Sequence, residues 1–371
     1  MVSMKHLQVL SRRIHIMVFA TTSFYFLARK GVSGLMPLSS SSRLGSFHGN
    51  LGMRMVATTA ADTIHEAQLV QDMLYRVRSI NQMPDDVRAN LMDFVVDGVK
   101  LGKVVPKIAE LLCSVKGDGL GSVFQVQDET LTLTDAAGSS PESRTNAVGQ
   151  VMQQLRQDGV VTGWRNELYP VAETFYSSPK FLMERAAVSL LGALEYGVHI
   201  NGLVQDSLFD EPKMWIARRS KTKSKFPGML DHLVAGGQPA GLSLMENVIK
   251  ECEEEAGVPE ELARAGIHAA GAISYEGWDP KSSKISRVVL FNYDLYLPAD
   301  FQPKPVDGEV EEFFLWSMDE TKESMALDYP DPIKPNCYVV IIDYLLRKGF
   351  ISPETPGYLD LLRELRSGDC Q

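Results

Sequence analysis

One stretch of the chain, residues 236–258, limits the possible folds more than any other. It reads GGQPAGLSLMENVIKECEEEAGV and joins a glycine-containing loop to a run with helical periodicity. Ser243 and Glu246 have the spacing of a capping box, which starts a helix, and Gly257 is the residue type that ends one. The sequence therefore predicts a tight loop over 236–242 that leads into a short helix with a defined beginning and end.

The acidic side chains of this helix gather on one face. At about 100° per residue, Glu251, Glu254 and Glu255 share roughly a third of the circumference. The apolar stripe of the helix consists of Val248, Ile249, Cys252 and Ala256. Like charges three or four residues apart cost an isolated helix on the order of 0.2–0.5 kcal/mol per pair, so this crowding needs an explanation. A hard divalent cation such as Mg²⁺ provides one, because it prefers oxygen ligands, and a solvated acidic face is the alternative.

The loop, the capped helix and the acidic cluster together resemble the Nudix box of the Nudix hydrolase superfamily. The tail of that motif reads Arg-Glu-hydrophobic-x-Glu-Glu-x-Gly-hydrophobic, and residues 250–258 fit it with Lys250 in place of the arginine. Leu242 stands where the family usually has a glutamate, and the glycine loop is slightly short. The resemblance implies a Nudix fold, a loop at Gly236 and Gly237, and Mg²⁺ or Mn²⁺ as cofactor.

Other segments carry a second, longer resemblance. They are GWRNELYPV (163–171), LMERAAVSLLG (182–192), YGVHINGLV (196–204), MWIARRSKTKSKFPGMLDHLVAGG (214–237) and KECEEEAGV (250–258). Over about residues 65–350 they look like the plant and fungal Nudix proteins with a thiamine pyrophosphokinase-related N-terminal region. This resemblance implies hydrolysis of thiamine diphosphate, especially its oxidised or damaged forms, to the monophosphate and phosphate, which is a task of metabolite repair.

The chain of 371 residues, 44% of them hydrophobic, is long enough for two domains with separate cores. We expect an α+β N-terminal module over 62–195, related to thiamine pyrophosphokinase by resemblance. An α/β/α sandwich with a mixed sheet, the Nudix hydrolase domain, should follow over 196–351. Residues 352–371 are expected to form a C-terminal helix and tail.

Residues 1–61 have the composition of a targeting presequence. They contain seven Lys or Arg residues, a serine run at 39–42 and no acidic residue. An apolar stretch over 14–28 precedes the serine run, which favours a plastid leader, with a mitochondrial leader as the alternative. Without this segment the formal charge falls from −10 to −17, which argues against nucleic-acid or anionic-membrane partners for the processed protein. We expect no stable membrane association, and a homodimer is left open.

The four cysteines are Cys113, Cys252, Cys337 and Cys370. Their spacing matches no metal or redox motif, which fits a reducing compartment. Cys252 lies on the apolar stripe of the acidic helix and is interpreted as a small buried hydrophobic residue.

The hydrophobic pattern predicts the elements around the acidic helix. Strands are expected over 198–204, 214–219, 230–235, 269–275, 288–296 and 310–316, and helices over 336–348 and 358–365. In the N-terminal module we expect helices over 62–80 and 145–158, a hairpin through Asp97-Gly98, and loops over 116–122 and 134–144.

The chemistry of breaking a diphosphate bond assigns provisional roles to the acidic helix. Such a reaction needs charge neutralisation on phosphate oxygens and an oriented water. Glu251 and Glu255 are the first candidates as metal ligands, and Glu254 is a further ligand or the catalytic base. Glu309, Glu311 and Glu312 are alternative bases. Lys250 is expected to pair with Glu254 and to orient the helix.

The densest basic run of the processed chain contains the candidate phosphate-binding residues. Arg218 and Arg219 are the candidates because guanidinium groups bind phosphate oxygens bidentately, whereas Lys221, Lys223 and Lys225 are interpreted as a solvated loop. Trp215 and His232 are either core residues or contacts to a ligand ring. Residues 163–171 are interpreted as part of the interface between modules, with a ligand pocket as the alternative.

These observations predict an enzyme, a hydrolase acting on diphosphate bonds with a small-molecule substrate. Thiamine diphosphate is the first expected substrate, and another diphosphate such as ADP-ribose or a dinucleotide is the alternative. A non-catalytic binding module is the third interpretation, although a degenerate box would normally have lost its glutamates.

Overall fold

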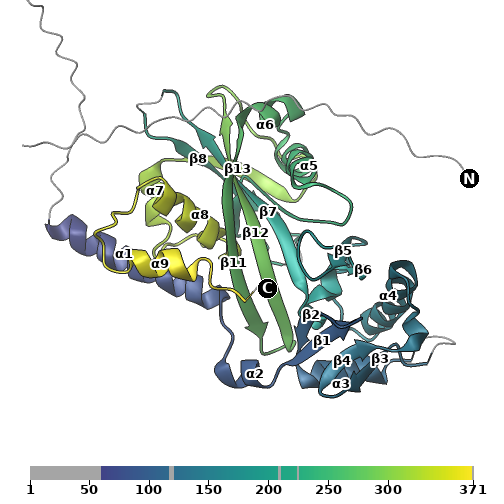
Figure 1. Cartoon of the computed structure of the whole chain (residues 1–371). Helices are drawn as coiled ribbons and strands as arrows, with labels where there is room; N and C mark the ends of the chain where they lie inside the picture. Colours follow the sequence, from purple (N-terminus) through teal and green to yellow (C-terminus); the bar gives the residue numbers. More distant parts are fainter. Residues whose placement is uncertain (1–59, 117–120, 208–209, 224, 370–371) are drawn as a thin grey trace, which may run out of the picture. The chain divides into compact units, whose positions relative to one another are not determined.

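The protein is described by a computed structural model that covers residues 60–116, 121–207, 210–223 and 225–369 (Figure 1). Almost all of the predicted presequence, residues 1–61, lies outside these ranges, so that interpretation stays a prediction. Residues 57–371 belong to one compact unit. Within the described ranges, no helix is both long enough and apolar enough to cross a membrane.

The structure combines helices and strands along the whole described chain. The helices are α1 (Ala60–Ile80), α2 (Asp85–Ala89), α3 (Pro106–Ser114), α4 (Pro141–Gln157), α5 (Leu244–Ala256), α6 (Glu260–Gly266), α7 (Met318–Glu323), α8 (Pro335–Arg347) and α9 (Tyr358–Glu364), with 3-10 turns η1 (Asp135–Ala137) and η2 (Arg185–Leu190). The strands of the first half are β1 (Met92–Val96), β2 (Val99–Val104), β3 (Phe124–Gln127), β4 (Thr130–Leu133), β5 (Leu168–Val171) and β6 (Phe181–Glu184). Those of the second half are β7 (Leu194–Val204), β8 (Lys213–Arg219), β9 (Leu230–His232), β10 (Val234–Gly237), β11 (Ile267–Asp279), β12 (Lys284–Leu297) and β13 (Val310–Trp316).

The larger sheet organises the second half of the chain. Its strand order is β11-β12-β7-β8-β13, with β10 paired to β7 and β9 paired to β8. The β7–β12 pair is parallel, whereas β11–β12, β7–β8 and β8–β13 are antiparallel, so the sheet is mixed as expected. The two central strands are long and buried, which is why the hydrophobic pattern of the sequence identified them.

Helices cover both faces of this sheet (Figure 1). One apolar cluster joins the sheet to α1, α8 and α9 and includes Met73, Ile216 and Ile341. A separate cluster joins the sheet to α5 and α6 and includes Val198 and Cys252. This arrangement confirms the expected α/β/α sandwich, and the burial of Cys252 confirms its reading as a core residue.

The first half of the chain has its own apolar core. A small sheet of order β2-β1-β4-β3 packs with α3 and α4, and its core contains Phe94, Leu112 and Met152. The hairpin between β1 and β2 turns at Asp97 and Gly98, whose φ values are 53° and 75°. Two positive φ angles are the mark of the tight turn that Asp-Gly predicts, and the α+β character of this module is confirmed.

Most of the predicted elements are present, with shifted ends. The helix expected over 62–80 is α1, those expected over 336–348 and 358–365 are α8 and α9, and the strand expected over 310–316 is β13. The strand expected over 230–235 is instead two strands that meet at Leu233. The reason is tertiary, because β9 pairs with β8 whereas β10 pairs with β7.

Two further expectations need correction in the N-terminal module. The loop expected over 134–144 is wrong from Pro141 onward, because Ser140 caps α4 and Pro141 occupies its first turn. The sequence analysis also missed short elements, namely α2, α3, β3 to β6, α6 and α7. Each is too short for a periodic pattern to stand out from its flanks.

The predicted division at residue 195 stays a prediction. Helix α1 precedes the N-terminal module in sequence but packs against α8 and α9 of the second half. Arg78 forms an ion pair with Glu364 at 2.7 Å, and Lys322 forms one with Glu66 at 2.8 Å. The first helix of the described chain therefore belongs in space to the sandwich.

Candidate active site

Helix α5 has the local structure that its sequence predicts. The Ser243 side chain accepts a hydrogen bond from the Glu246 backbone, and the Glu246 side chain accepts one from the Ser243 backbone. Gly257 ends the helix in the left-handed conformation, with φ 61°. Val248, Cys252 and Ala256 are fully buried, so the opposite charged side of the helix has a fixed orientation.

Two of the three predicted metal ligands lie against β10, the strand that precedes the helix. Gly236 and Gly237, expected in a loop, are the last residues of this strand, because they pair with β7. The backbone N–H of Ala235 donates a hydrogen bond of 3.0 Å to Oε2 of Glu255. A Cβ atom at Gly236 would lie 2.4 Å from Cδ of Glu251. No other residue type fits at Gly236 without moving the carboxylate, so a glycine is required at this position of β10 for a steric reason.

Burial makes both of these carboxylates difficult to ionise in the absence of a cation. Desolvation raises the pKa of Glu255 well above its ordinary value, and the neighbouring charge of Glu251 adds to the effect. Desolvation also raises the pKa of Glu251, and Lys250 only partly opposes it. Paired, poorly solvated carboxylate oxygens are suitable donors for a hard divalent cation, so the residues present fit such an ion.

Glu254 lies at the exposed edge of the same face. Nζ of Lys250 donates hydrogen bonds to Oε2 of Glu254 at 2.7 Å and to Oε1 of Glu251 at 3.2 Å. The expected pairing of Lys250 with Glu254 is therefore present. Lys250 holds two of the three glutamates at the distance of an ion pair.

The N-terminal module reaches this site through residues that the sequence analysis did not single out individually. A Cβ atom at Gly237 would lie 1.7 Å from Oη of Tyr169 and 2.7 Å from Cζ of Arg185. The Arg185 guanidinium lies over the Tyr169 ring at 5.4 Å and forms an ion pair of 2.8 Å with Glu167. Tyr169 and Glu167 belong to the segment 163–171, which thus lies against the end of β10. The signals in the sequence were the resemblance of this segment to other proteins and its mixture of polar and aromatic residues, which suited an interface between modules or a ligand pocket.

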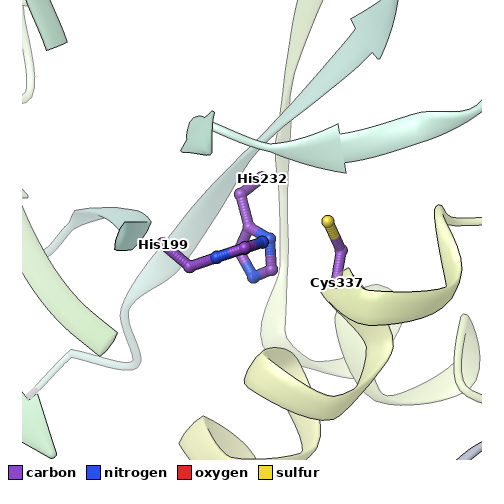
Figure 2. Close-up of side chains that lie close together, drawn as sticks. All are labelled: His199, His232 and Cys337. Atoms are coloured by element: carbon purple, nitrogen blue, oxygen red, sulfur yellow. The ribbon is translucent and has the colours of Figure 1, made fainter. Parts of the chain in front are cut away.

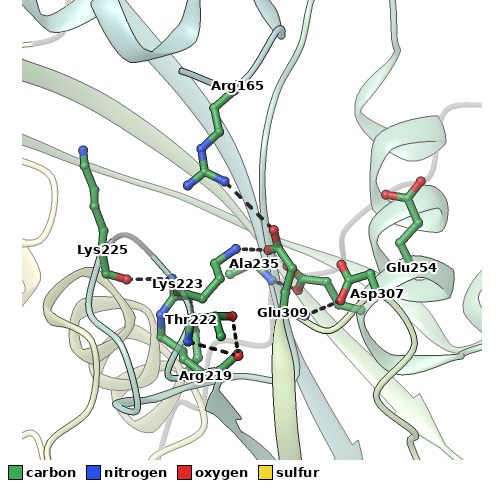
Figure 3. A network of polar contacts seen from close by, with 12 residues as sticks. Arg165, Arg219, Thr222, Lys223, Lys225, Ala235, Glu254, Asp307 and Glu309 are labelled. Carbon is green, nitrogen blue, oxygen red and sulfur yellow. Dashed lines mark hydrogen bonds and ion pairs between the residues drawn. The ribbon is translucent and has the colours of Figure 1, made fainter. Parts of the chain in front are cut away.

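A second group of charges faces the acidic helix from the loop after β8 (Figure 3). Lys223 forms an ion pair with Glu309, and Arg165 of the N-terminal module lies 4.0 Å from the same carboxylate. Burial raises the pKa of Glu309, but Lys223 and Arg165 outweigh it and hold the pKa below its ordinary value. Arg165 and Lys223, which come from the two halves of the described chain, thus contact the same carboxylate.

The predicted phosphate-binding arginines already have carboxylate partners. Arg218 forms bidentate hydrogen bonds with Asp331 at 3.0 and 2.5 Å, and it also contacts Glu312. Arg219 pairs with the buried carboxylate of Asp231 at 2.5 Å. Asp331 lies 113 residues after Arg218, and Asp231 reaches Arg219 because β9 pairs with β8, so the spacing of the basic run could not show these pairs.

The fold also decides where the remaining candidate residues lie. Glu311 accepts a hydrogen bond from the backbone of Lys221 at 3.0 Å. Trp215 and His232 are 5% and 1% exposed, so both are core residues rather than contacts to a ligand ring. Whether each of these side chains is buried or exposed depends on the face of the sheet on which it lies, which the sequence alone did not fix.

Two family models match the chain. Residues 72–195 match a model described as "Domain of unknown function (DUF4743)", and residues 207–336 match one described as "NUDIX domain". The first model supports the presence of an N-terminal domain, and its description names no relation to thiamine pyrophosphokinase.

Curated relatives from Arabidopsis thaliana match a large part of the chain. "Nudix hydrolase 20, chloroplastic" is 49% identical over 230 residues, which span 62% of this chain and 60% of that protein. "Nudix hydrolase 24, chloroplastic" is 42% identical over 280 residues, which span 73% of this chain and 75% of that protein. Among solved structures, a MutT/nudix family protein from Enterococcus faecalis is 18% identical with a TM-score of 0.34, covering 45% of this chain and 67% of the other.

Proposed function

This chain belongs to the Nudix hydrolase family, and we propose that it is a Mg²⁺-dependent diphosphatase that hydrolyses thiamine diphosphate to the monophosphate and phosphate. The oxidised or damaged forms of the cofactor are the preferred substrates in this proposal. The family supports the hydrolase class, and the sequence resemblance over residues 65–350 supports the substrate. The observation that carries the chemistry is the acidic face of α5 against Ala235 and Gly236 of β10.

The metal site in this proposal consists of Glu251, Glu254 and Glu255. Nudix hydrolases generally use divalent cations such as Mg²⁺ or Mn²⁺. When bound, the ion would neutralise negative charge on the diphosphate oxygens. Lys250 orients Glu254 and Glu251 through its two hydrogen bonds.

Glu254 is the proposed base because it lies on the same face as the half-buried Glu251 and Glu255 and is itself exposed. It accepts the proton of the attacking water as the water oxygen bonds to the terminal phosphorus. The bond between that phosphorus and the bridging oxygen breaks, and the bridging oxygen stays on the monophosphate. Glu309 is less suitable as a base because two cationic side chains, Lys223 and Arg165, hold the pKa of its carboxylate below its ordinary value, whereas Glu254 pairs, among the described residues, with Lys250 alone.

Cationic side chains near the acidic face provide the means to attract an anionic substrate. Lys223 and Arg165 face Glu309, and Arg185 lies beside Gly237 at the end of β10. Arg218 and Arg219 stay in the proposal as phosphate contacts, although each would have to share its guanidinium with a carboxylate. The N-terminal module, proposed to be related to thiamine pyrophosphokinase, contributes Arg165 and Arg185 to the substrate site in this proposal.

Localisation in the plastid is part of the proposal. It rests on the composition of residues 1–61 and on the word "chloroplastic" in the names of the two Arabidopsis relatives. A fusion of residues 1–61 to a fluorescent protein should enter plastids. Entry into mitochondria instead would favour the alternative leader.

The substrate is tested by phosphate release from the purified protein with Mg²⁺, with products resolved by chromatography. The panel contains thiamine diphosphate, its oxidised analogues, ADP-ribose and dinucleotides. We expect the highest kcat/KM on the thiamine compounds. A preference for ADP-ribose or a dinucleotide would retain the hydrolase and reject the substrate, and a lack of turnover on the whole panel would favour a binding module.

The proposed site is tested by Glu254→Gln and Glu255→Gln. Both variants remove one carboxylate charge and keep the side-chain shape, so we expect a loss of kcat of roughly a hundredfold or more with the fold intact by circular dichroism. Glu253→Gln is the matched control, because this exposed glutamate lies on the same helix but outside the acidic face. Wild-type rates in both site variants would refute the assignment.

A further inference from the structure

Three side chains with nitrogen or sulfur donors meet in the interior of the protein, apart from the carboxylates of α5. They are His199 of β7, His232 of β9 and Cys337 of α8 (Figure 2). Their exposed fractions are 3%, 1% and 0%. One donor atom from each residue lies within 4.8 Å of the others. The three residues are far apart in sequence, so only the fold brings them together.

The imidazole rings of this cluster lack the hydrogen bonds that buried polar groups normally make. Among the described residues, both ring nitrogens of His232 and Nδ1 of His199 have no partner. The two rings meet edge to face, with centroids 5.2 Å apart and an interplanar angle of 85°, so they do not satisfy each other. A buried polar atom without a partner costs about 1–3 kcal/mol. Several such atoms around one point indicate a ligand for those nitrogens.

We propose that His199, His232 and Cys337 bind a zinc ion. Two imidazole nitrogens and one thiolate are a donor set typical of Zn²⁺, whereas Mg²⁺ requires oxygen ligands. Donors of a zinc ion at about 2.0–2.3 Å lie roughly 3.5 Å from one another, so small side-chain rotations suffice to close the present spacing. Binding replaces the Sγ–H proton of Cys337 with the metal and releases that proton to solvent, while both imidazoles bind in their neutral form.

A carboxylate and two cationic side chains surround the thiol of Cys337. Sγ of Cys337 donates a hydrogen bond of 2.7 Å to Oδ1 of Asp231, and that oxygen also accepts one of 2.9 Å from the His232 backbone. The Asp231 carboxylate in turn binds Lys334 at 3.1 Å and Arg219 at 2.5 Å. The positive charges of Lys334 and Arg219 disfavour a bare cation at this place. The thiolate and Asp231 offset them, so the cluster needs Cys337 in order to hold a metal.

The complete burial of the cluster indicates a structural role. An ion held there would join α8 to β7 and β9. It would thereby fix one helical layer to the sheet. It would use no residue of the proposed catalytic face, so the proposal is independent of the substrate and of the diphosphatase activity.

The experiment uses the full chain, produced with zinc in the medium and purified without chelator. Elemental analysis should find one zinc per chain in the wild type and in Cys252→Ser, an equally buried thiol outside the cluster. Cys337→Ser and His232→Gln should bind zinc at least roughly tenfold more weakly. Zinc below background in the wild type, or an unchanged content in Cys337→Ser, would overturn the proposal.

A second measurement needs no variant and therefore does not depend on whether the variants fold. Co²⁺ added to the metal-free wild-type chain should give the sulfur-to-cobalt charge-transfer band in the near ultraviolet and the visible bands of a four-coordinate ion. One equivalent of Zn²⁺ should remove them. If Co²⁺ binds without a thiolate band, the ion occupies carboxylates elsewhere and the proposed site is wrong.

Discussion

Glu195 shows how the surroundings of one carboxyl group can govern the response of the protein to pH. It lies at the start of β7, close to Lys225 and Arg185. Desolvation raises its pKa from 4.5 to about 7, and the two cationic side chains only partly oppose this effect. The folded protein therefore keeps a proton on Glu195 at pH values where the unfolded chain has lost it.

We predict that Glu195 destabilises the protein as the pH rises. Below its ordinary pKa of 4.5 both states are protonated, and between 4.5 and about 7 the folded state holds more protons, so stability falls across this window and is constant above it. The loss is at most about 3 kcal/mol. Urea midpoints at pH 5 and pH 8 should therefore differ less in Glu195→Gln than in the wild type.

The control for this prediction is Glu110→Gln, which changes an exposed glutamate of α3 in the same way. It should follow the wild-type pH dependence. Equal pH dependence in the wild type and Glu195→Gln would show that the carboxyl group is ionised in the folded state throughout the window.

At the scale of a single element, α5 depends on its ends as much as on its apolar stripe. The helix has only 13 residues, too few to be stable in isolation, and its caps satisfy backbone groups that would otherwise be unpaired. The same caps set the point along the helix at which Glu251 and Glu255 meet Gly236 and Ala235 of β10. Stability and the geometry of the acidic face are thus linked through the capping box.

Ser243→Ala should destabilise the protein by about 1 kcal/mol, because the N–H of Glu246 loses its side-chain acceptor. Ser243→Asp should restore most of the loss, since aspartate is also an effective cap. Chemical denaturation monitored by circular dichroism measures both. A Ser243→Ala variant as stable as the wild type would indicate that packing alone sets the start of α5.

At the scale of the whole molecule, α1 completes the sandwich across a long separation in sequence. Five of its apolar side chains are buried against α8, α9 and the sheet, namely Leu69, Val70, Met73, Leu74 and Val77. Arg76 lies 3.7 Å from the centre of the Tyr338 ring and donates a hydrogen bond of 2.7 Å to the carbonyl of Met325. The second half of the chain therefore lacks part of its covering layer without residues 60–80.

We predict that a chain beginning at residue 81 is less stable than one beginning at residue 60 by several kcal/mol. Each buried large apolar side chain contributes about 1.5–3 kcal/mol, which is partly offset by the entropy of ordering the helix. Thermal unfolding and size-exclusion chromatography of the two chains make the comparison. Similar midpoints and a monodisperse shorter chain would mean that α1 is an accessory helix.

The sequence by itself determined the features that depend on neighbours within one turn of helix or one strand. The caps of α5, the acidic face of that helix, the Asp-Gly hairpin and the long strands β7 and β12 all follow from periodicity and turn chemistry. Those signals are local, so they survive without knowledge of the fold. They also sufficed for the fold class, while the family followed from the resemblance of residues 236–258 to the Nudix box.

Only the tertiary structure decided which distant residues meet. It divided the strand at Leu233 because β9 and β10 pair with different neighbours. It gave Arg218 and Arg219 carboxylate partners, placed Tyr169 and Arg185 against Gly237, and gathered two histidines with Cys337. Each of these contacts joins segments that no local pattern connects, because chain packing rather than residue spacing sets the distance between them.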